Sequence, residues 1–483
     1  MRLSSLTDAH IAAIPAGAEA LEIACITADS RAAAPGALFV ALAGSKADGA
    51  AFIADAVAKG AVAVLVADTA EVPAGLAVPV LRAAEPRRAL ALMAARLYGV
   101  QPEIAVAITG TSGKTSVAEF TRQLFAAAGH RAASLGTIGV VKPDGAVYGS
   151  LTTPDPVTLH ETLAALAGEG ITRLAFEASS HGLDQYRLDG VRIAAAAFTN
   201  LGRDHLDYHP TKEAYLAAKL RLFEELLPAG APAVVNMDDP RAADVAAIAR
   251  RRGLPLISVG AVGETVRLVR LAREGFAQAL TIAHAGRTYD VRLPLIGAYQ
   301  AANALVAVGL TLAVGEDPSV VIPALAHVSG VKGRLEIAGE RNGSLAVVDY
   351  AHKPEALEAA LEGVRPFATG RVICVFGCGG DRDRGKRPLM GAIAAARADV
   401  VIVTDDNPRS EEPAAIRREI LAAAPGATEI GDRGEAIGAA VRMMQPGDVV
   451  LVAGKGHETG QIVGQTVRPF SDHECLRDAL RSP

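Results

Sequence analysis

The clearest chemical signal in the sequence is the glycine-rich segment Gly110–Ser116. It follows a β-branched run at residues 104–109 and precedes residues 114–128, where apolar side chains recur at helical spacing. Between a strand and a helix, such a turn offers backbone N–H groups and a helix N-terminus to phosphate oxygens. Lys114 can then reach the β- and γ-phosphates, and the Thr115 hydroxyl can ligate Mg²⁺. Only two residues separate the first glycine from the Gly-Lys pair, so a turn that merely caps the helix is the alternative.

Polar loops also follow apolar, strand-like runs in the last third of the chain. The runs lie at residues 346–348, 371–376, 399–403 and 448–452. The loops that follow them lie at residues 349–352, 377–382, 405–409 and 454–458. In open parallel sheets, ligands bind outside the carboxyl ends of the strands. The four loops are therefore predicted to form one binding surface.

Alternating apolar runs and amphipathic stretches must position these loops. From residue 99 onward, this alternation predicts an α/β fold of parallel sheets with helices on both faces. The preceding part has short apolar runs between turn signals, with a strand-like run at residues 37–42. A length of 483 residues suits about three domains. We predict that these domains are residues 1–98, 99–330 and 331–483.

The composition narrows the classes of function. A net charge of −5 without a basic stripe argues against a nucleic-acid or membrane-surface role. No apolar run reaches the roughly 18 residues that span a bilayer, and residues 1–10 lack the features of a signal peptide. Neither zinc spacing nor a disulfide framework is visible in the four cysteines, Cys25, Cys374, Cys378 and Cys475. We therefore expect a soluble, cytoplasmic protein without nucleic-acid partners or membrane insertion.

The short form of the Gly110–Ser116 segment resembles the phosphate loop of the Mur ligases and of the related folylpolyglutamate synthases. This resemblance implies transfer of the γ-phosphoryl group of ATP to a carboxylate. An amino group then attacks the acyl phosphate, which gives an amide, ADP and phosphate. The resemblance also implies an N-terminal uridine-binding α/β domain, a central P-loop ATPase-like parallel sheet and a C-terminal Rossmann-like domain.

The resemblance assigns contacts with ATP and Mg²⁺ to residues spread along the chain. Glu177 and His205 would ligate Mg²⁺, and Lys219 would do so once CO₂ has converted it into a carbamate. The expected catalytic residues are Lys114, Glu177, His205 and Lys219, and the expected metal ligands are Thr115, Glu177, His205 and carbamylated Lys219. The expected nucleotide contacts are Gly110, Thr111, Ser112, Gly113, Lys114, Thr115, Ser116, Asn303, Arg334, Asp349 and His352.

Two further segments, residues 152–154 and 177–187, resemble the branch of the family that extends a UDP-linked muramoyl dipeptide. Hydroxyls, an amide and a guanidinium suit a sugar, a peptide and a carboxylate. Taken singly, such residues are also common in turns and helix caps. The expected contacts with the UDP-muramoyl dipeptide are Ser30, Ser45, Lys46, Ala47, Thr152, Thr153, Ser179, Gln185 and Arg187, with Ser30 at the uracil.

The Asp-Asn-Pro-Arg segment at residues 406–409 resembles the form that goes with meso-2,6-diaminopimelate, whereas lysine-adding relatives lack the arginine. Diaminopimelate carries a second carboxylate, which Arg409 can bind with two hydrogen bonds, while Asp406 or Glu458 can bind an ammonium group. An Asn-Pro pair is also a common start of a turn. The expected contacts with diaminopimelate are Arg382, Asp406, Asn407, Pro408, Arg409, Gly454 and Glu458.

The expected function is therefore the ATP-dependent addition of diaminopimelate to a UDP-linked muramoyl dipeptide in peptidoglycan precursor synthesis, by a monomer. A folylpolyglutamate synthase shares the phosphate loop, but would leave residues 179–183 and 406–409 unexplained. A scaffold that binds nucleotide without catalysis would tolerate the loss of Lys114, Glu177 or His205, and all three are present.

Overall fold

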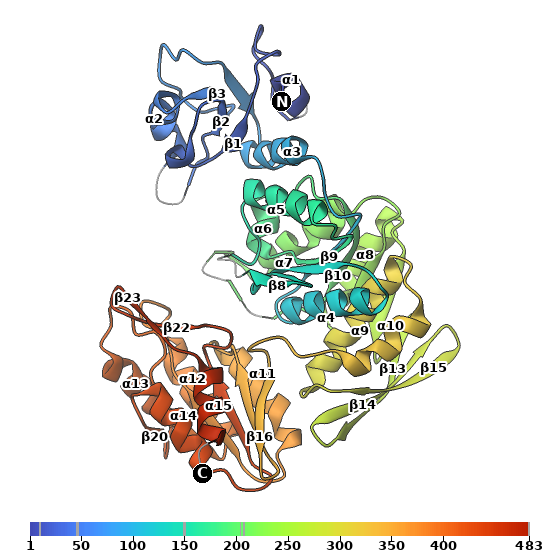
Figure 1. Cartoon of the computed structure of the whole chain (residues 1–483), viewed down its shortest axis with the longest axis vertical. Helices are drawn as coiled ribbons and strands as arrows, with labels where there is room; N and C mark the ends of the chain where they lie inside the picture. The colour runs from blue at the N-terminus through green and yellow to red at the C-terminus, as the bar shows by residue number, and fades with distance from the viewer. Residues whose placement is uncertain (9–10, 45–47, 148–150, 203, 206–207, 482–483) are drawn as a thin grey trace. The chain divides into compact units, whose positions relative to one another are not determined.

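The structure is a computed structural model that describes residues 1–481 except 9–10, 45–47, 148–150, 203 and 206–207 (Figure 1). The chain divides into two compact units, residues 1–258 with 309–317, and residues 259–308 with 318–483. The three domain ranges given above stay a prediction. Within the described residues, no helix combines the length and apolar character needed to cross a membrane.

The first unit begins with a small sheet of four parallel strands in the order β1-β2-β3-β4. Helix α3 covers one face of this sheet with Leu90 and Met93, and α2 covers the other with Ile53 and Ala56. Because both faces are covered, all four residues of β2 are buried. The elements are α1 (Leu3–Leu6), β1 (Cys25–Thr27), β2 (Ala37–Val40), α2 (Ile53–Ala58), β3 (Ala61–Ala67), β4 (Val80–Ala83) and α3 (Pro86–Tyr98).

A larger sheet in the same unit has β5 at its centre, between β9 and β10 and parallel to both. Strands β6 and β11 extend the parallel part, and β7 and β8 add an antiparallel edge. The strands are β5 (Ile104–Thr109), β6 (Ala132–Gly136), β7 (Gly139–Lys142), β8 (Gly145–Val147), β9 (Arg173–Glu177), β10 (Ile193–Phe198) and β11 (Ala233–Asn236). The strand predicted at residues 104–109 is confirmed.

Helices cover this sheet and place the glycine-rich loop. Helix α4 starts at Lys114, and the apolar face predicted for it is fully buried at Val117, Phe120 and Leu124. It packs on β6 and β9. The helices of this region are α4 (Lys114–Ala127), α5 (Pro156–Gly168), α6 (Ser180–Asp184), α7 (Lys212–Arg221), a π-helical turn (Leu222–Leu226) and α8 (Ala242–Arg252).

Residues 266–293 in the second unit differ from the predicted alternation of strands and helices. They form two antiparallel hairpins, because tight turns at Gly275 and at Ala285-Gly286 reverse the chain. Ala285 and Gly286 both have positive φ, as the type I′ turn of a two-residue hairpin requires. The elements are β12 (Leu256–Gly260), β13 (Val266–Glu274), β14 (Ala277–His284), β15 (Arg287–Leu293), α9 (Ala298–Ala313) and α10 (Pro318–Ala324).

The remainder of the second unit is built on a six-stranded sheet in the order β16-β17-β21-β18-β19-β20. All neighbours are parallel except β16 and β17. The four predicted strands correspond to β17 (Ser344–Asp349), β18 (Val372–Phe376), β19 (Val400–Val403) and β21 (Val449–Ala453), and the α/β class with parallel sheets is confirmed. The other strands are β16 (Glu336–Arg341), β20 (Thr428–Glu429), β22 (Gly460–Val463) and β23 (Thr466–Pro469).

Separate apolar cores lie on the two faces of this sheet. One contains Leu361, Met390 and Ile416 from α11, α12 and α13, and the other contains Ile437 and Leu476 from α14 and α15. The helices are α11 (Pro354–Val364), α12 (Lys386–Arg397), α13 (Pro413–Leu421), α14 (Arg433–Arg442) and α15 (Asp472–Arg481).

A buried ion pair joins α14 to α15. Arg433 donates to both carboxylate oxygens of Asp472 at 2.7 Å each, and both side chains have no exposed surface. We predict that Asp472→Ala lowers the free energy of unfolding of this region by about 3–5 kcal/mol, because it leaves a buried guanidinium without its counter-charge. Urea unfolding, followed through the amide protection of β18 and β21, measures the change.

Glu358→Gln is the control for this variant, because it removes a carboxylate from an exposed pair with Arg397 that joins α11 to α12 on the other face of the sheet. Such pairs contribute at most about 1 kcal/mol. An equal loss of stability in the two variants would contradict the prediction.

Candidate active site

The loop between β5 and α4 has a backbone conformation that requires glycine at its first position. Gly110 has φ of 145°, and a Cβ atom there would lie 1.9 Å from the Thr199 hydroxyl oxygen. The Thr199 hydroxyl donates to the carbonyl of Ser112 at 2.7 Å, and the N–H of Ser112 donates to the side chain of Asn200 at 2.9 Å. The segment that follows β10 thus supports the loop at the N-terminus of α4, where a phosphate would bind.

Two lysines meet at one carbonyl of this loop. The Nζ atoms of Lys114 and Lys219 both donate to the Gly110 carbonyl, at 2.9 and 2.7 Å. Lys219 is 1% exposed, and its Nζ lies 4.2 Å from the centre of the Tyr215 ring. Burial, together with the charge of Lys114, holds the pKa of Lys219 well below its ordinary value. Lysine side chains are almost never this buried unless they are paired.

Glu177 ends β9, directly beside β5, and is 2% exposed. Its carboxylate accepts hydrogen bonds from the N–H of Thr137 at 2.7 Å and from the hydroxyl of Thr137 at 3.2 Å. The Thr137 hydroxyl also lies 3.1 Å from that of Thr152. The hydroxyl of Thr153 donates to the Glu177 carbonyl and accepts from the N–H of Ser179. The structure therefore brings together four residues singled out from the sequence, and it adds Thr137.

Aromatic rings surround His205, which has a positive φ of 52°. Its ring centre lies 4.7 Å from that of His181 and 6.2 Å from that of Tyr215. The Tyr215 hydroxyl in turn lies 3.2 Å from the hydroxyl of Thr111 in the phosphate loop. His181 and Tyr208, whose ring centres are 4.0 Å apart, extend the cluster and were not singled out from the sequence. Within the described ranges, no group of three or more His, Cys, Asp or Glu side chains is arranged around a metal position.

A cavity of about 490 Å³ opens in the first unit near these residues. Gln185 and Arg187, both expected at the muramoyl dipeptide, line it, and Arg187 donates to the carbonyl of Thr153 at 2.8 Å. The remaining lining residues are Thr27, Ala28, Asp29, Leu42, Arg87, Leu90, Leu151, Asp155, Pro156, Val157 and Thr158. Among these, Arg87 and Asp155 are charged groups that the sequence did not indicate.

Four described residues that were expected at the dipeptide are not among those that line this cavity. Ser30 is buried in a short 3-10 turn beside it, and Lys59 donates to the Ser30 carbonyl at 3.1 Å. Thr152, Thr153 and Ser179 lie instead at Glu177, as described above. The expected contacts Ser45, Lys46 and Ala47 fall outside the described residues.

In the second unit, the loops after β19 and β21 meet at Asn407. The Asn407 side-chain oxygen accepts from Lys455 at 3.0 Å and from the N–H of Ile462 at 2.9 Å, and its nitrogen donates to Glu458 at 3.0 Å. Lys455, which is fully buried, also donates to Glu458 at 2.8 Å. A Cβ atom at Gly454 would lie 2.7 Å from the Asp406 carboxylate, so glycine permits this close approach. Sequence reasoning missed Lys455, although it lies inside a predicted loop.

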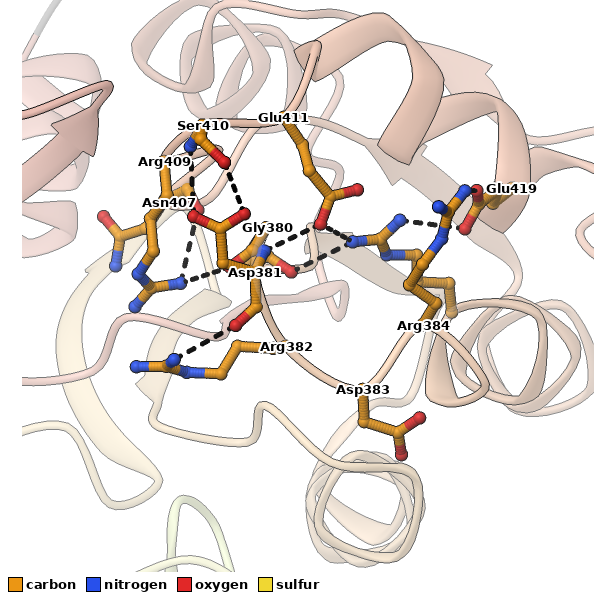
Figure 2. Close-up of polar contacts among 12 residues, drawn as sticks. Gly380, Asp381, Arg382, Asp383, Arg384, Asn407, Arg409, Ser410, Glu411 and Glu419 are labelled. Carbon is orange, nitrogen blue, oxygen red and sulfur yellow. Dashed lines mark hydrogen bonds and ion pairs between the residues drawn. The ribbon is translucent and has the colours of Figure 1, made fainter. Parts of the chain in front are cut away.

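Arg409 and Arg382 come from neighbouring loops (Figure 2). The Nη1 atom of Arg409 donates to the Gly380 carbonyl at 2.8 Å, and Arg382 donates to the Asp381 carbonyl at 3.1 Å. Both guanidinium groups point the same way in this view, away from Arg384. Among the described residues of this unit, the Nε and Nη2 atoms of Arg409 have no hydrogen-bond partner. This edge of the guanidinium can bind a carboxylate with two bonds. Pro408, which directly precedes Arg409, is part of the same loop.

The remaining expected nucleotide contacts form a connected group in the second unit. Asn303 donates to Gln300 at 2.9 Å, and Gln300 donates to the carbonyl of Arg334 at 3.2 Å. The Arg334 guanidinium lies over the Tyr350 ring at 4.9 Å. Gln300 had no assigned role from the sequence, and here it bridges two residues that did.

Two titratable side chains of this group have shifted pKa values. Burial raises the pKa of Asp349 to about 6, although its carboxylate accepts from the N–H groups of Leu335 and Ala351. Burial lowers the pKa of His352 to about 4, so this ring is neutral at pH 7. A neutral ring and a hydrogen-bonded carboxylate suit recognition of polar groups of a nucleotide.

Three family models match the chain in sequence. They are described as Mur ligase family, catalytic domain (residues 22–101), Mur ligase middle domain (residues 108–311) and Mur ligase, glutamate ligase domain (residues 333–456).

Curated relatives match over the whole chain. The chain is 58% identical to a UDP-N-acetylmuramoyl-L-alanyl-D-glutamate--2,6-diaminopimelate ligase of Bradyrhizobium diazoefficiens, over 100% of this chain and 99% of the relative. It is 53% identical to the protein of the same name in Caulobacter vibrioides, over 98% and 97% of the two chains.

Solved structures of similar fold include a protein of the same name. A structure of a UDP-N-acetylmuramoyl-L-alanyl-D-glutamate--2,6-diaminopimelate ligase matches with a TM-score of 0.73 and 32% identity, over 99% of this chain and 98% of the other. A folylpolyglutamate synthase of Mycobacterium tuberculosis complexed with ADP and AMPPCP has a TM-score of 0.62 at 19% identity, over 76% and 92% of the chains, which shows likeness of fold alone. On the three family models and the full-length relatives, this chain belongs to the Mur ligase family.

Proposed function

We propose that the chain is the ATP-dependent ligase that joins meso-2,6-diaminopimelate to UDP-N-acetylmuramoyl-L-alanyl-D-glutamate. The products are the UDP-muramoyl tripeptide, ADP and phosphate. The observation that carries the choice of amino acid is the Nε–Nη2 edge of Arg409, which is free among the described residues. Arg409 shares its loop with Asn407, which donates to Glu458 in the loop after β21. The full-length relatives named above support the same reaction.

The chemistry follows from the groups at the two sites. A carboxylate oxygen of the dipeptide attacks the γ-phosphorus of ATP, and ADP leaves. The amine of diaminopimelate then attacks the acyl carbon, the amide bond forms, phosphate leaves and the amine loses its extra proton. The loop N–H groups of residues 110–116 and Lys114 would hold the phosphates, and Asp406 or Glu458 would bind an ammonium group of the amino acid.

Mg²⁺ would supply charge neutralisation at the transferred phosphoryl group. Its proposed ligands are Thr115, Glu177, His205 and carbamylated Lys219. Oxygen donors suit this ion. Glu177 lies on the strand next to β5, and the loop after β5 leads to Thr115 in the first turn of α4. Carbamylation replaces the Lys219 cation with a carboxylate-like anion, which removes the repulsion of a buried ammonium group for Mg²⁺.

We further propose that residues 1–98 bind the uridine end of the substrate, residues 99–330 bind ATP and residues 331–483 bind the amino acid. The three matched family models divide the chain in the same order, which supports this assignment. The reaction would take place in the cytoplasm, on small-molecule substrates, and would serve the cell wall that maintains cell shape and permits division. The chain is proposed to act as a monomer.

Phosphate release with ATP, Mg²⁺ and the UDP-muramoyl dipeptide tests the function, with meso-2,6-diaminopimelate compared with L-lysine and the product identified by mass. Release that requires the dipeptide and prefers diaminopimelate is the expected result. A preference for lysine would overturn the role of Arg409. No turnover with either amino acid would overturn the proposed reaction.

Arg409→Ala should lower kcat/KM for diaminopimelate at least about 100-fold, because it leaves the second carboxylate without its cation. The KM for ATP should change less than about twofold, since the nucleotide residues lie elsewhere. Arg384→Ala is the matched control, because Arg384 points away from Arg409 and pairs with Glu419 (Figure 2). Equal effects of the two variants would contradict this assignment.

Gly136→Ala should disturb the Glu177 carboxylate, because a Cβ atom at Gly136 would lie 2.1 Å from a carboxylate oxygen of Glu177. We expect Mg²⁺-dependent turnover to fall at least about tenfold, while nucleotide binding without Mg²⁺ changes little. Gly168→Ala is the control, since a Cβ atom there meets nothing within 4 Å. Titration of activity and of nucleotide affinity against Mg²⁺ measures both effects, and a Gly136→Ala enzyme with normal Mg²⁺ dependence would remove Glu177 from the metal site.

Lys219→Ala should abolish most of the turnover, and short carboxylates should restore part of it by taking the place of the carbamate. In the unchanged enzyme, ¹³C-bicarbonate should give a carbamate resonance that Lys219→Ala lacks. Lys212→Ala, on the same helix and in its first turn, is the control. A spectrum without the resonance would refute carbamylation, whatever the activity.

A further inference from the structure

The loop that contains Arg409 is held in an unfavourable backbone conformation. Arg409 has φ of 53°, a region that non-glycine residues enter at a cost and keep only when their surroundings hold them there. The Arg409 N–H donates to the carbonyl of Ile462 at 3.1 Å, and its carbonyl accepts from the N–H of Gly464 at 2.7 Å. The hairpin that begins with β22 thus holds the backbone, but it leaves the side chain to other contacts.

The side-chain direction depends on the loop at residues 379–382 (Figure 2). The Nη1 atom of Arg409 binds the carbonyl of Gly380, the residue before Asp381. Asp381 also has positive φ, 54°, so this second loop needs its own support. A Cβ atom at Gly380 would lie 2.0 Å from the Pro408 carbonyl oxygen, which shows how closely the two loops approach.

Direct bonds tie Asp381 to the two residues that follow Arg409. The Asp381 carboxylate accepts from the Ser410 hydroxyl at 2.6 Å and from the Ser410 N–H at 3.2 Å. The Asp381 N–H donates to the Glu411 carboxylate at 2.7 Å. Together with the bond from Arg409 to Gly380, these contacts close a ring between the two loops (Figure 2). Moving Asp381 would therefore move the carbonyl that orients Arg409.

A buried arginine anchors this ring to the body of the domain. Arg387 in α12 has no exposed side-chain surface and donates to Glu411 at 2.8 Å and to Glu419 at 2.9 Å. The bond from Arg387 also lowers the pKa of Glu411 to about 2, so Glu411 stays an acceptor for the Asp381 N–H at neutral pH. None of these side chains is required to touch the amino acid itself.

We propose that Asp381 and Ser410 are positioning residues that fix the Arg409 guanidinium against the second carboxylate of the amino-acid substrate. They thereby set the preference for diaminopimelate over lysine. This inference rests on the proposed function, in which Arg409 binds that carboxylate. The contacts predict that weakening the pair loosens Arg409 without disturbing the nucleotide or dipeptide sites.

Kinetics of Asp381→Ala and Ser410→Ala test the substrate effect. Asp381→Ala should raise the KM for diaminopimelate about tenfold and lower the preference over lysine by a similar factor, with kcat and the KM for ATP within about twofold. Ser410→Ala, which keeps the backbone N–H bond, should give a smaller rise. Asp381→Asn, which keeps an acceptor, should restore most of the loss. Glu358→Gln, which breaks an exposed pair on α11, should change nothing.

Amide hydrogen exchange of the protein without substrate tests the positioning separately. The N–H of Gly380, whose carbonyl orients Arg409, donates to the Asn407 carbonyl across the two loops. It should exchange at least about fivefold faster in Asp381→Ala than in the unchanged protein, and at an unchanged rate in Glu358→Gln. Unchanged exchange in Asp381→Ala would overturn the positioning role, whether or not the protein uses diaminopimelate. An unchanged KM for diaminopimelate and an unchanged preference over lysine would overturn it as well. Absence of turnover in the unchanged protein would instead overturn the proposed function, and the exchange rates would still decide the positioning role.

Discussion

Parallel strands deliver the loops that follow them to one edge of a sheet, and the phosphate site depends on this constraint. Glu177 is the register partner of Ile108, and Phe198 is the register partner of Thr109. The chain segments that follow these strands therefore meet at the loop after β5. Because the strands are buried on both faces, a slip in register would bury or expose the wrong side chains throughout. The hydrophobic core thus fixes the positions of groups that are themselves polar.

Charge is concentrated where this edge meets α4. Two lysines share one carbonyl, and one of them is almost completely buried. Such an arrangement is costly without an anion, because burial disfavours a charged ammonium group and a second cation raises the cost. A phosphate at the loop, or conversion of Lys219 into a carbamate, would relieve it. The buried carboxylate of Glu177, in contrast, already has partners, because it accepts two hydrogen bonds from Thr137 that hold it in place. The polar groups are oriented before a substrate arrives, which is what electrostatic stabilisation of a reaction requires.

The proposed amino-acid pocket lies at the carboxyl ends of the strands of a different sheet, and side-chain contacts fix its geometry. Asn407 joins the loop after β19 to the loop after β21, with Lys455 buried beneath it. Arg409 and Asp381 both keep positive φ, and the side chain of each bonds to the loop of the other. Strain of this kind persists only where the neighbours over-determine the conformation. The result is a guanidinium whose direction is set by the domain and not by its own rotamers.

The local pattern of residues was enough to predict the α/β class, the strand and helix on either side of the glycine-rich loop, and four of the six strands of the C-terminal sheet. A helix or strand that buries one face has apolar residues at a regular spacing along the chain. A loop that follows a parallel strand lies at the carboxyl edge of the sheet, where ligands bind. The local pattern did not indicate the hairpins at residues 266–293, where tight turns interrupt the expected alternation. A local sequence pattern also does not indicate which distant segments of the chain come into contact. Lys219 is buried because segments distant in the chain pack around it. The carbonyl oxygen of Gly110, for example, lies 2.7 Å from its Nζ atom. The hydrogen bonds from Thr137 to Glu177, and those that join the loops of Asp381 and Arg409, likewise form between segments that are separate in the chain. These contacts could therefore be found only in the folded structure.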